Sequence, residues 1–462
     1  MATSEAKLGT GRTGGRKATT GVIPGRVALS VGCPDLQPPE GWKWTSLSSV
    51  AQLESGHTPS RRHLEYWAGD IPWIGIKDAT ANHGRTISDT YQHVSELGLK
   101  NSSARLLPAN TVCLSRTASV GFVVVMGRPM ATSQDFVNWV CGPNINAHYL
   151  KYILLAENEA LWRFASGTTH QTIYYPEAKA FHVCLPPRAQ QDAIAAVLGA
   201  LDHKIELNRT MGATLDAMAR ALFQSWFVDF DPVRAKLDGR APPGLDEATA
   251  ALFPAELEET ILGHTPKKWE ILSLDKVAEY LNGLALQKYP PGDGPTLPVI
   301  KIAQLRKGDS AGAERCNANL PPNYIVQDGD VLFSWSGSLE VELWCGGPGA
   351  LNQHLFKVNS SEFPKWFYYL WTLHHLDEFR LIAAGKATTM GHIQRGHLTL
   401  AKALVPPLPL LEAMTNTMAP LIDHVVALRS QSQTLAALRD ALLPSLLSGH
   451  VKIGYSSRGA AR

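Results

Sequence analysis

The sequence predicts an α+β protein built from two tandem copies of one unit, each copy ending in a long helix. Three observations predict this fold: the chain length, an internal repeat of about 220 residues, and a heptad pattern after each Pro-Pro pair. At 462 residues the chain is longer than the roughly 250 to 300 residues at which one hydrophobic core stops growing. More than one folded domain is therefore expected.

The internal repeat keeps its order along the whole chain. Residues Trp42, Leu47, Val50, Ala51 and Gly56 recur as Trp269, Leu274, Val277, Ala278 and Gly283, and the stretches around Pro72, Ser115, Gln134, Gly167 and Pro186 recur around Pro298, Ser334, Gln353, Gly385 and Pro406. Within each copy, short β-branched and aromatic runs alternate with Gly, Pro and Asn and with helix-like stretches. This mixture predicts the α+β class.

The second part of each copy predicts a long helix with a narrow apolar seam. Apolar residues spaced alternately three and four apart form this seam, and they are expected to take part in helix packing or partner contact. They are Val197, Leu201, Leu215, Leu222, Trp226 and Phe227 in the first copy and Leu421, Val425, Leu428, Leu435 and Leu442 in the second. Met211 and Met218 continue the first seam, and polar Asn208 and Ser432 interrupt the two seams. Pro420 is expected to kink or restart the second helix. The two helices are expected to pack as an antiparallel coiled coil with pseudo-two-fold symmetry.

These patterns divide the chain into seven segments. They are a disordered basic extension (1–39), a first mixed domain (40–185), a first helix (186–230), a linker with at most one short helix (231–265), a second mixed domain (266–405), a second helix (406–449) and a C-terminal tail (450–462).

Composition and the missing motifs exclude several classes of protein. The formal net charge of +2 excludes a histone-like polycation, and six cysteines without a C-x-x-C pair argue for a reducing cytosol over a zinc ribbon or a secreted disulfide scaffold. Apolar runs are too short for export or membrane insertion. No phosphate-binding G-x-x-x-x-G-K-[ST] loop, H-E-x-x-H or G-x-S-x-G motif is present, so neither catalytic residues nor a metal site is predicted.

The helical segments also carry a resemblance to a known family. Residues 185–191, 197–208, 221–232 and 435–449 hold the strings that carry it, and the string Trp226-Phe227-Val228-Asp229-Phe230 is the most specific. In these strings the chain resembles the specificity subunit of type I restriction-modification enzymes, over about residues 40 to 450. It departs from the family at Gln190, where an acidic residue is usual, and at Leu410-Leu411, where Glu-Gln is common.

The resemblance implies a non-catalytic, cytoplasmic DNA-binding protein. Residues 40–185 and 266–405 would be target-recognition domains, each reading half of a bipartite site in double-stranded DNA, and the helices would set the spacer between the halves. Two methylase (M) subunits carrying S-adenosylmethionine would dock at the helices and methylate adenine N6, and restriction (R) subunits using ATP and Mg²⁺ would join them. The chain itself would bind no cofactor.

Base readout favours Arg or Lys for guanine and Asn or Gln for adenine. The candidate DNA-binding residues are Arg61, Arg62, Lys77, Arg116, Gln134, His170 and Gln171 in the first domain, and Lys301, Arg306, Lys307, Gln353, Lys386 and Arg395 in the second. Because Gln134 and Gln353 occupy matching repeat positions, a structural role is as plausible for them as base contact. Asp202, Glu206 and Arg209 are expected on the outer helix face.

Two alternatives stay open at this point. A stand-alone two-domain enzyme, for instance a nuclease with an unrecognised site, would show Mg²⁺-dependent cleavage by the isolated chain. A protein-only scaffold with degenerate recognition domains would show no sequence-selective DNA protection.

Overall fold

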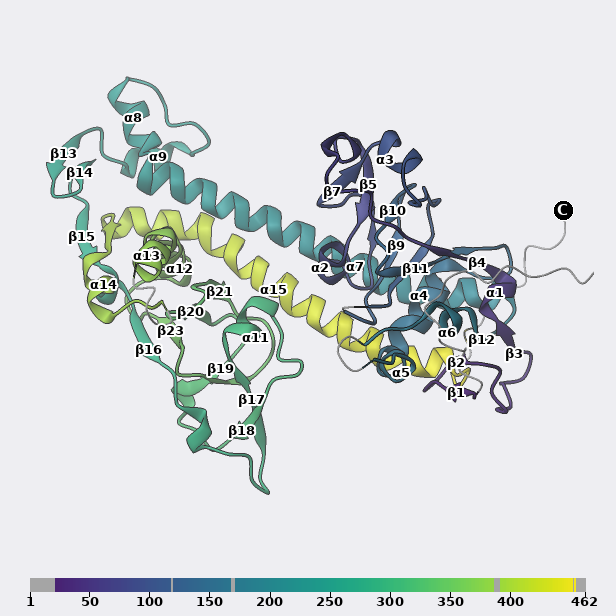
Figure 1. The fold of residues 1–462 in the computed structure, drawn as a ribbon. Helices are drawn as coiled ribbons and strands as arrows, with labels where there is room; N and C mark the ends of the chain where they lie inside the picture. The colour runs from purple at the N-terminus through teal and green to yellow at the C-terminus, as the bar shows by residue number, and fades with distance from the viewer. Residues whose placement is uncertain (1–20, 118, 168–170, 386–390, 452, 454–462) are drawn as a thin grey trace, which may run out of the picture. The chain divides into compact units, whose positions relative to one another are not determined.

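The computed structural model describes residues 21–117, 119–167, 171–385, 391–451 and 453, and it contains two compact units (Figure 1). Unit 1 comprises residues 1–203 and 436–462, and unit 2 comprises residues 204–435. Two long helices, α7 (Arg188–Phe223) and α15 (Leu408–Leu447), contribute residues to both units.

Unit 1 contains three sheets. Its strands are β1 (Ile23–Pro24), β2 (Leu29–Val31), β3 (Lys43–Ser46), β4 (Ala51–Ser55), β5 (Ile71–Ile74), β6 (Thr86–Ile87), β7 (Gln92–Val94), β8 (Val112–Ser115), β9 (Val123–Met126), β10 (Ala131–Thr132), β11 (Phe136–Cys141) and β12 (Phe181–Leu185). They form sheets in the orders β4-β11-β8-β9-β6, β1-β2-β12-β3 and β10-β5-β7. Its short helices are α1 (Leu47–Val50), η1 (Leu64–Tyr66), α2 (Ile76–Ala81), α3 (Glu96–Lys100), α4 (Ala147–Ala156), α5 (Asn158–Phe164) and α6 (Tyr175–Lys179).

The central strands β8 and β9 are buried on both faces, which explains why their sequences are almost continuously apolar. Val112, Leu114, Val123 and Val125 pack in one core together with residues of α4. The alternate residues Cys113, Val124 and Met126 pack in a second core with Ile74. Successive side chains of a strand point to opposite faces, so both cores need apolar residues from the same short run.

Unit 2 repeats this arrangement. Its strands are β13 (Leu257–Thr260), β14 (Gly263–Pro266), β15 (Glu270–Ser273), β16 (Glu279–Asn282), β17 (Thr296–Ile300), β18 (Arg315–Asn317), β19 (Ile325–Val326), β20 (Val331–Ser334), β21 (Val341–Leu343), β22 (Gly349–Leu351), β23 (Leu355–Asn359) and β24 (Lys402–Val405). Its other helices are the π-helical turn η2 (Gln224–Val228), α8 (Asp231–Leu237), α9 (Glu247–Leu252), α10 (Leu274–Val277), η3 (Leu286–Lys288), α11 (Ile302–Lys307), η4 (Pro322–Tyr324), α12 (Lys365–His374), α13 (Leu376–Ala384) and α14 (Arg395–Leu400).

The strand pairings confirm the predicted duplication. The sheet β16-β23-β20-β21 of unit 2 corresponds to β4-β11-β8-β9 of unit 1, with antiparallel neighbours in both. Each unit also has one short parallel pair directly before a six-residue helix, β5 with β10 before α2 and β17 with β22 before α11. The α+β class and the two-copy architecture are therefore as predicted.

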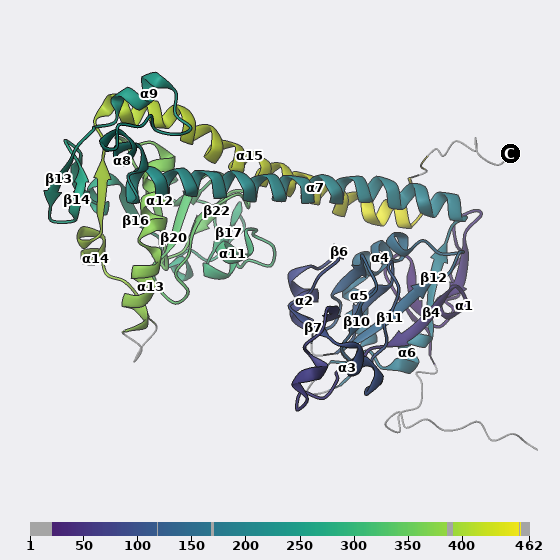
Figure 2. The ribbon, with the colours of Figure 1, turned by 90° about the horizontal axis from the view of Figure 1, so that it is seen from above.

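The two long helices pack against each other and run antiparallel, as predicted. In unit 1 the first turns of α7 meet the last turns of α15, where Arg439 Nη1 lies 2.9 Å from Asp202 Oδ1. In unit 2 the later turns of α7 meet the earlier part of α15, where Asn208 Nδ2 donates to Gln431 Oε1 at 2.7 Å. The polar seam residue Asn208 thus pairs across the two helices. Figure 2 shows both helices along their length, and α15 is continuous through Pro420.

The register of the predicted seam needs correction on α7. Val197, Met211 and Met218 are between 39% and 48% exposed, whereas Gly212 and Ala219 are buried. At these positions the larger apolar residues therefore lie on the exposed side of α7 and the small residues on its buried side. Asp202, expected on the outer face, instead bonds to Lys151, Tyr152 and Arg439.

The predicted disordered extension is wrong for residues 21–39. Strand β2 lies between β1 and β12 in a sheet, and Leu29 and Val31 are buried. The fully buried carboxylate of Glu157 accepts hydrogen bonds from four successive backbone N–H groups of residues 26–29, at 2.6 to 3.1 Å. A tertiary partner 130 residues away along the chain therefore orders a segment that lacks hydrophobic periodicity. Residues 1–20 of the extension lie outside the described residues.

The segment 231–265, predicted as a linker with at most one short helix, contains α8, α9 and most of the β13-β14 hairpin. Phe253 and Trp226 are buried together, with ring centroids 6.3 Å apart, and Phe227 stacks near Trp269 in the same core. Trp226, Phe227 and Phe230 therefore pack into the core of unit 2, directly after the end of α7.

Candidate nucleic-acid interface

In unit 1 three loops meet at the end of the parallel pair β5-β10. The N–H of His57 donates to the carbonyl of Thr132 at 2.9 Å, and the hydroxyl of Thr58 donates to Oε1 of Gln134. Arg116 Nε donates to the carbonyl of Gln134 at 3.2 Å. Thr58, Gln134 and Arg116, which come from distant parts of the chain, thus form one hydrogen-bonded group on the surface.

The approach of these loops requires glycine at position 56. A Cβ atom on Gly56 would lie 2.0 Å from the carbonyl oxygen of Ser133, far inside van der Waals contact. The equivalent Gly283 in unit 2 would place a Cβ 2.2 Å from the carbonyl oxygen of Asn352. The repeated glycine therefore allows the loop that follows it to lie against the loop that carries the repeated glutamine, Gln134 in unit 1 and Gln353 in unit 2.

Residues 166–167 and 171–173 of unit 1 lie next to the same group. The N–H of Ile173 donates to the carbonyl of Arg116 at 2.8 Å, and the hydroxyls of Thr117 and Thr172 lie 2.8 Å apart. The side chain of Gln171 donates to the carbonyl of Gly167 within its own loop. The candidate His170 lies outside the described residues.

Two further candidates of unit 1 lie against aromatic rings. The guanidinium carbon of Arg61 is 3.6 Å from the ring centroid of Trp67, and its Nη2 donates to Oε1 of Gln92 at 2.9 Å. Lys77 Nζ lies 4.2 Å from the ring centroid of Tyr91. Arg62 is exposed. Cations on aromatic faces at an exposed surface are a pattern that nucleic-acid-binding proteins use.

Unit 2 repeats the backbone of this interface with different side chains. The N–H of Leu284 donates to the carbonyl of Leu351 at 3.0 Å, which repeats the bond from His57 to Thr132. The N–H of Ile393 donates to the carbonyl of Trp335 at 3.0 Å, which repeats the bond from Ile173 to Arg116. The indole N–H of Trp335 donates to the carbonyl of Gln353 at 3.2 Å. Trp335 in unit 2 thus occupies the place of Arg116 in unit 1, and both bind the carbonyl of the repeated glutamine.

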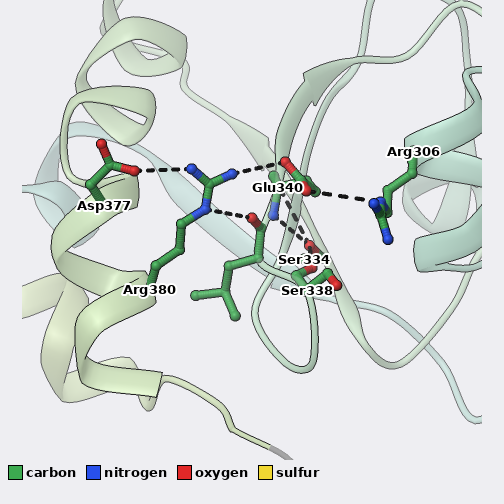
Figure 3. A network of polar contacts seen from close by, with 7 residues as sticks. Arg306, Ser334, Ser338, Glu340, Asp377 and Arg380 are labelled. Carbon is green, nitrogen blue, oxygen red and sulfur yellow. Dashed lines mark hydrogen bonds and ion pairs between the residues drawn. The ribbon is translucent and has the colours of Figure 1, made fainter. Parts of the chain in front are cut away.

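The candidate cations of unit 2 are paired with carboxylates. Lys301 Nζ lies 2.7 Å from Glu314, and Lys307 Nζ lies 3.0 Å from Asp309. Figure 3 shows Glu340 between two guanidinium groups, with Arg380 Nη2 at 3.0 Å and Arg306 Nε at 4.0 Å. Such exposed pairs contribute little to stability and can exchange a carboxylate for a phosphate.

The last two candidates of unit 2 do not join the loop group. Arg395 Nη2 donates to the carbonyl of Tyr280 at 3.3 Å, and the arginine lines a pocket with Asp275, Glu279 and Glu362. The negative charge of these carboxylates would disfavour phosphate binding next to Arg395. Lys386 lies outside the described residues.

Electrostatics distinguish Arg116 from the exposed candidates. Burial lowers the pKa of Arg116, and the charge of Asp135 and the nearby Tyr175 and Tyr174 oppose that shift. A guanidinium stays charged in proteins at neutral pH. Because Arg116 has lost part of its hydration and no carboxylate among the described residues forms an ion pair with it, an anionic or acceptor-rich ligand would recover favourable interaction.

Sequence reasoning missed the residues that hold these candidates in place. Thr58, Trp67, Gln92 and His354 all contact candidate side chains. The repeat contained one usable signal for Thr58. This residue lies two positions after the repeated Gly56, which in its own unit contacts the loop that carries Gln134. The contacts of Arg61 with Trp67 and Gln92 lie outside the repeated residues and had no such signal.

Within residues 21–117, 119–167, 171–385, 391–451 and 453, no group of three or more His, Cys, Asp or Glu side chains is placed to hold a metal ion. Across the same residues, no helix is both long and apolar enough to cross a membrane.

Known proteins resemble this chain over most of its length. A family model described as the type I restriction modification DNA specificity domain matches residues 39–216. The type I restriction enzyme MjaIX specificity subunit of Methanocaldococcus jannaschii is 25% identical over 426 residues, covering 90% of this chain and 94% of that protein. The HindI specificity subunit of Haemophilus influenzae is 22% identical over 386 residues, covering 70% and 84%.

The fold agrees as well. The crystal structure of a type I restriction-modification S subunit from M. genitalium superposes with a TM-score of 0.50 at 14% identity, covering 90% of this chain and 98% of that one. The chain is thus similar over about nine-tenths of its length to a specificity subunit of a type I restriction enzyme, in sequence and in fold.

Proposed function

We propose that each unit reads one half of a bipartite DNA sequence. The observation that carries this proposal is the loop group built twice on the same backbone with different side chains, Arg116 in unit 1 and Trp335 in unit 2. A repeated scaffold with different surface residues suits two half-sites of different sequence. The shared scaffold would position each unit on the DNA, and the differing side chains would select the bases. We take residues 21–185 and 266–405 as the two recognition domains.

The helices suit the role of a spacer and docking element. Helix α7 has 36 residues, and at about 1.5 Å rise per residue it is roughly 54 Å long. In unit 2 the side chains of Leu207, Met211 and Met218 are 39% to 48% exposed on this helix. An exposed apolar stripe of this kind is typical of a protein–protein contact. We infer that two methylase subunits dock on the helices.

The chemistry then belongs to the partners. The methylase subunits would bring S-adenosylmethionine and methylate adenine N6 in each half-site, and restriction subunits would bring ATP and Mg²⁺. This chain would supply the sequence readout and the fixed distance between the half-sites.

The proposal is tested by co-expressing the chain with its methylase subunit and mapping N6-methyladenine across a genome by single-molecule sequencing. We expect a bipartite motif with a fixed gap that disappears when this chain is omitted. An assembled complex that adds no methylation would instead support a protein-only scaffold. Mg²⁺-dependent cleavage of DNA by the chain alone would support a stand-alone nuclease.

A further inference from the structure

The side chain of Arg61 in unit 1 is exposed, yet aromatic rings and a hydrogen bond hold it in place. The guanidinium of Arg61 stacks on Trp67 and lies 5.3 Å from the ring centroid of Trp73, while Gln92 accepts one of its hydrogen bonds. Trp67 and Trp73 meet edge to face, with ring centroids 5.1 Å apart. An arginine fixed in one rotamer loses less conformational entropy when it binds a ligand.

The same two tryptophans hold the backbone that carries Arg61. Trp67 Nε1 donates to the carbonyl of Ser60 at 3.3 Å, and Trp73 Nε1 donates to the carbonyl of His57 at 3.1 Å. Thr58 lies between these two carbonyls and bonds to Gln134. The loop is therefore fixed at both ends, and Arg61 is connected to the group of loops that includes Arg116.

The donors of Arg61 are available to a ligand. A guanidinium carries five N–H donors in a planar fork, and Gln92 takes one of them. Among the described residues no carboxylate forms an ion pair with Arg61, in contrast to Lys301, Arg306 and Lys307 of unit 2. The neighbouring Arg62 is equally exposed, but the residues described offer its side chain no ring or hydrogen-bond partner.

We propose that Arg61 reads a guanine of the first half-site, held in its reading conformation by the ring of Trp67 and the amide of Gln92. The planar fork matches O6 and N7 of guanine in the major groove, which together accept two parallel hydrogen bonds. Trp67 and Gln92 are positioning residues for this contact. The inference rests on the proposed function and adds to it the residue and the base.

The first test compares methylation motifs of the full complex carrying Arg61→Ala, Arg61→Lys, Trp67→Leu or Arg62→Ala. We expect Arg61→Ala to make one G·C position of one half-site degenerate, with discrimination there falling roughly 5- to 150-fold. Arg61→Lys keeps the charge but loses the fork, so it should also relax that position. Trp67→Leu should relax it partly, and Arg62→Ala should leave the motif unchanged.

The second test measures binding of the complex to duplexes in which that guanine is replaced by 7-deazaguanine, which lacks the N7 acceptor. Wild-type affinity should fall several-fold, while the Arg61→Ala complex should bind both duplexes equally. This comparison is internal to each variant, so a variant that assembles less well still gives an interpretable ratio.

The outcomes separate this inference from the proposed function. A wild-type bipartite motif that Arg61→Ala leaves unchanged overturns the inference and leaves the proposed function standing. A uniform loss of methylation without degeneracy also overturns it, because that is the result of a lost phosphate contact. A wild-type complex without any bipartite motif overturns both.

Discussion

At the scale of single residues, a buried charge network fastens the recognition fold of unit 1 to the long helices. Asp202 on α7 accepts hydrogen bonds from Lys151 Nζ at 2.7 Å, Tyr152 Oη at 2.6 Å and Arg439 at 2.9 Å. The side chain of Lys151 is only 4% exposed. In unit 2, Tyr369 Oη lies 3.4 Å from Asp216 of the same helix.

Replacing Asp202 by Asn should destabilise unit 1 by about 3 kcal/mol, because the buried ammonium of Lys151 loses its counter-charge. Urea denaturation followed by circular dichroism measures the change in the free energy of unfolding. Lys100→Ala is the matched control, since Lys100 and Glu96 form a pair that is 75% and 81% exposed and should contribute less than about 1 kcal/mol. Equal effects of the two substitutions would contradict the role given to the network.

The same carboxylate predicts an acid limit to stability. Burial raises the pKa of Asp202, but the charge of Lys151 and the hydrogen bonds from Lys151, Tyr152 and Arg439 outweigh burial and hold the pKa below the usual value of an aspartate. A depressed pKa stabilises the fold at pH above about 4, and this contribution is lost as the pH falls through the folded-state value. The wild-type free energy of unfolding should therefore fall more steeply below pH 4 than that of Asp202→Asn. Parallel slopes would argue against the network.

Residue roles were only partly predictable from the sequence. The repeat marked Gln134 and Gln353, and the structure places both at the corresponding loop contact in the two units. Asp202 was misplaced because its partner Lys151 lies 51 residues away, on a helix whose position no local pattern reveals. Which of the candidate residues touch DNA stays a prediction.

At the scale of elements, α7 carries a glycine in its interior that close packing does not require. Gly212 is buried, yet a Cβ atom added to it would meet no atom within 4 Å outside its own helix. A glycine inside a helix costs roughly 0.5 to 1 kcal/mol relative to alanine. The heptad pattern predicted the helix pair but placed Met211 and Met218 on the seam, because apolar spacing alone does not show which face of α7 is buried.

The substitution Gly212→Ala should accordingly raise the free energy of unfolding of the full chain by about 0.5 to 1 kcal/mol. Gly283→Ala provides the opposite case, because its Cβ would lie 2.2 Å from the carbonyl oxygen of Asn352 and should destabilise unit 2. Urea denaturation of both variants gives the comparison. A loss of stability in Gly212→Ala would mean that the helices need closer contact at this position than the open space indicates.

At the scale of the whole molecule, the duplication is not symmetric at its ends. Unit 1 has the extra strands β1 and β2 beside β12, while the corresponding strand β24 of unit 2 pairs with β15 in a two-stranded sheet. Unit 2 instead carries α8, α9 and the β13-β14 hairpin before its first repeat strand. Internal repetition in the sequence predicted the shared parts, whereas these additions occur once and had no second copy to reveal them.

This asymmetry determines where the first recognition domain can be exchanged. Replacing residues 21–185 by the corresponding part of another specificity subunit transfers β2 together with β12 and Glu157, so the hybrid should change one half-site of the methylation motif and keep the gap. Replacing residues 40–185 leaves the native β2 against a foreign β12 and without the Glu157 carboxylate. Losing these charge-assisted hydrogen bonds should cost about 2 kcal/mol and lower the melting temperature of unit 1 by roughly 4 to 8 °C.

Differential scanning calorimetry of the two hybrids, combined with their methylation motifs, tests the boundary. The conservative variant Glu157→Gln in the otherwise native chain serves as a second readout, because it removes only the carboxylate charge and should increase hydrogen exchange at residues 26–29. If the 40–185 hybrid melts at the same temperature as the 21–185 hybrid and the two report the same motif, residues 21–39 are an attachment and not part of the recognition domain. A lower melting temperature for the 40–185 hybrid, with the same half-site changed in both, places the domain boundary before β1.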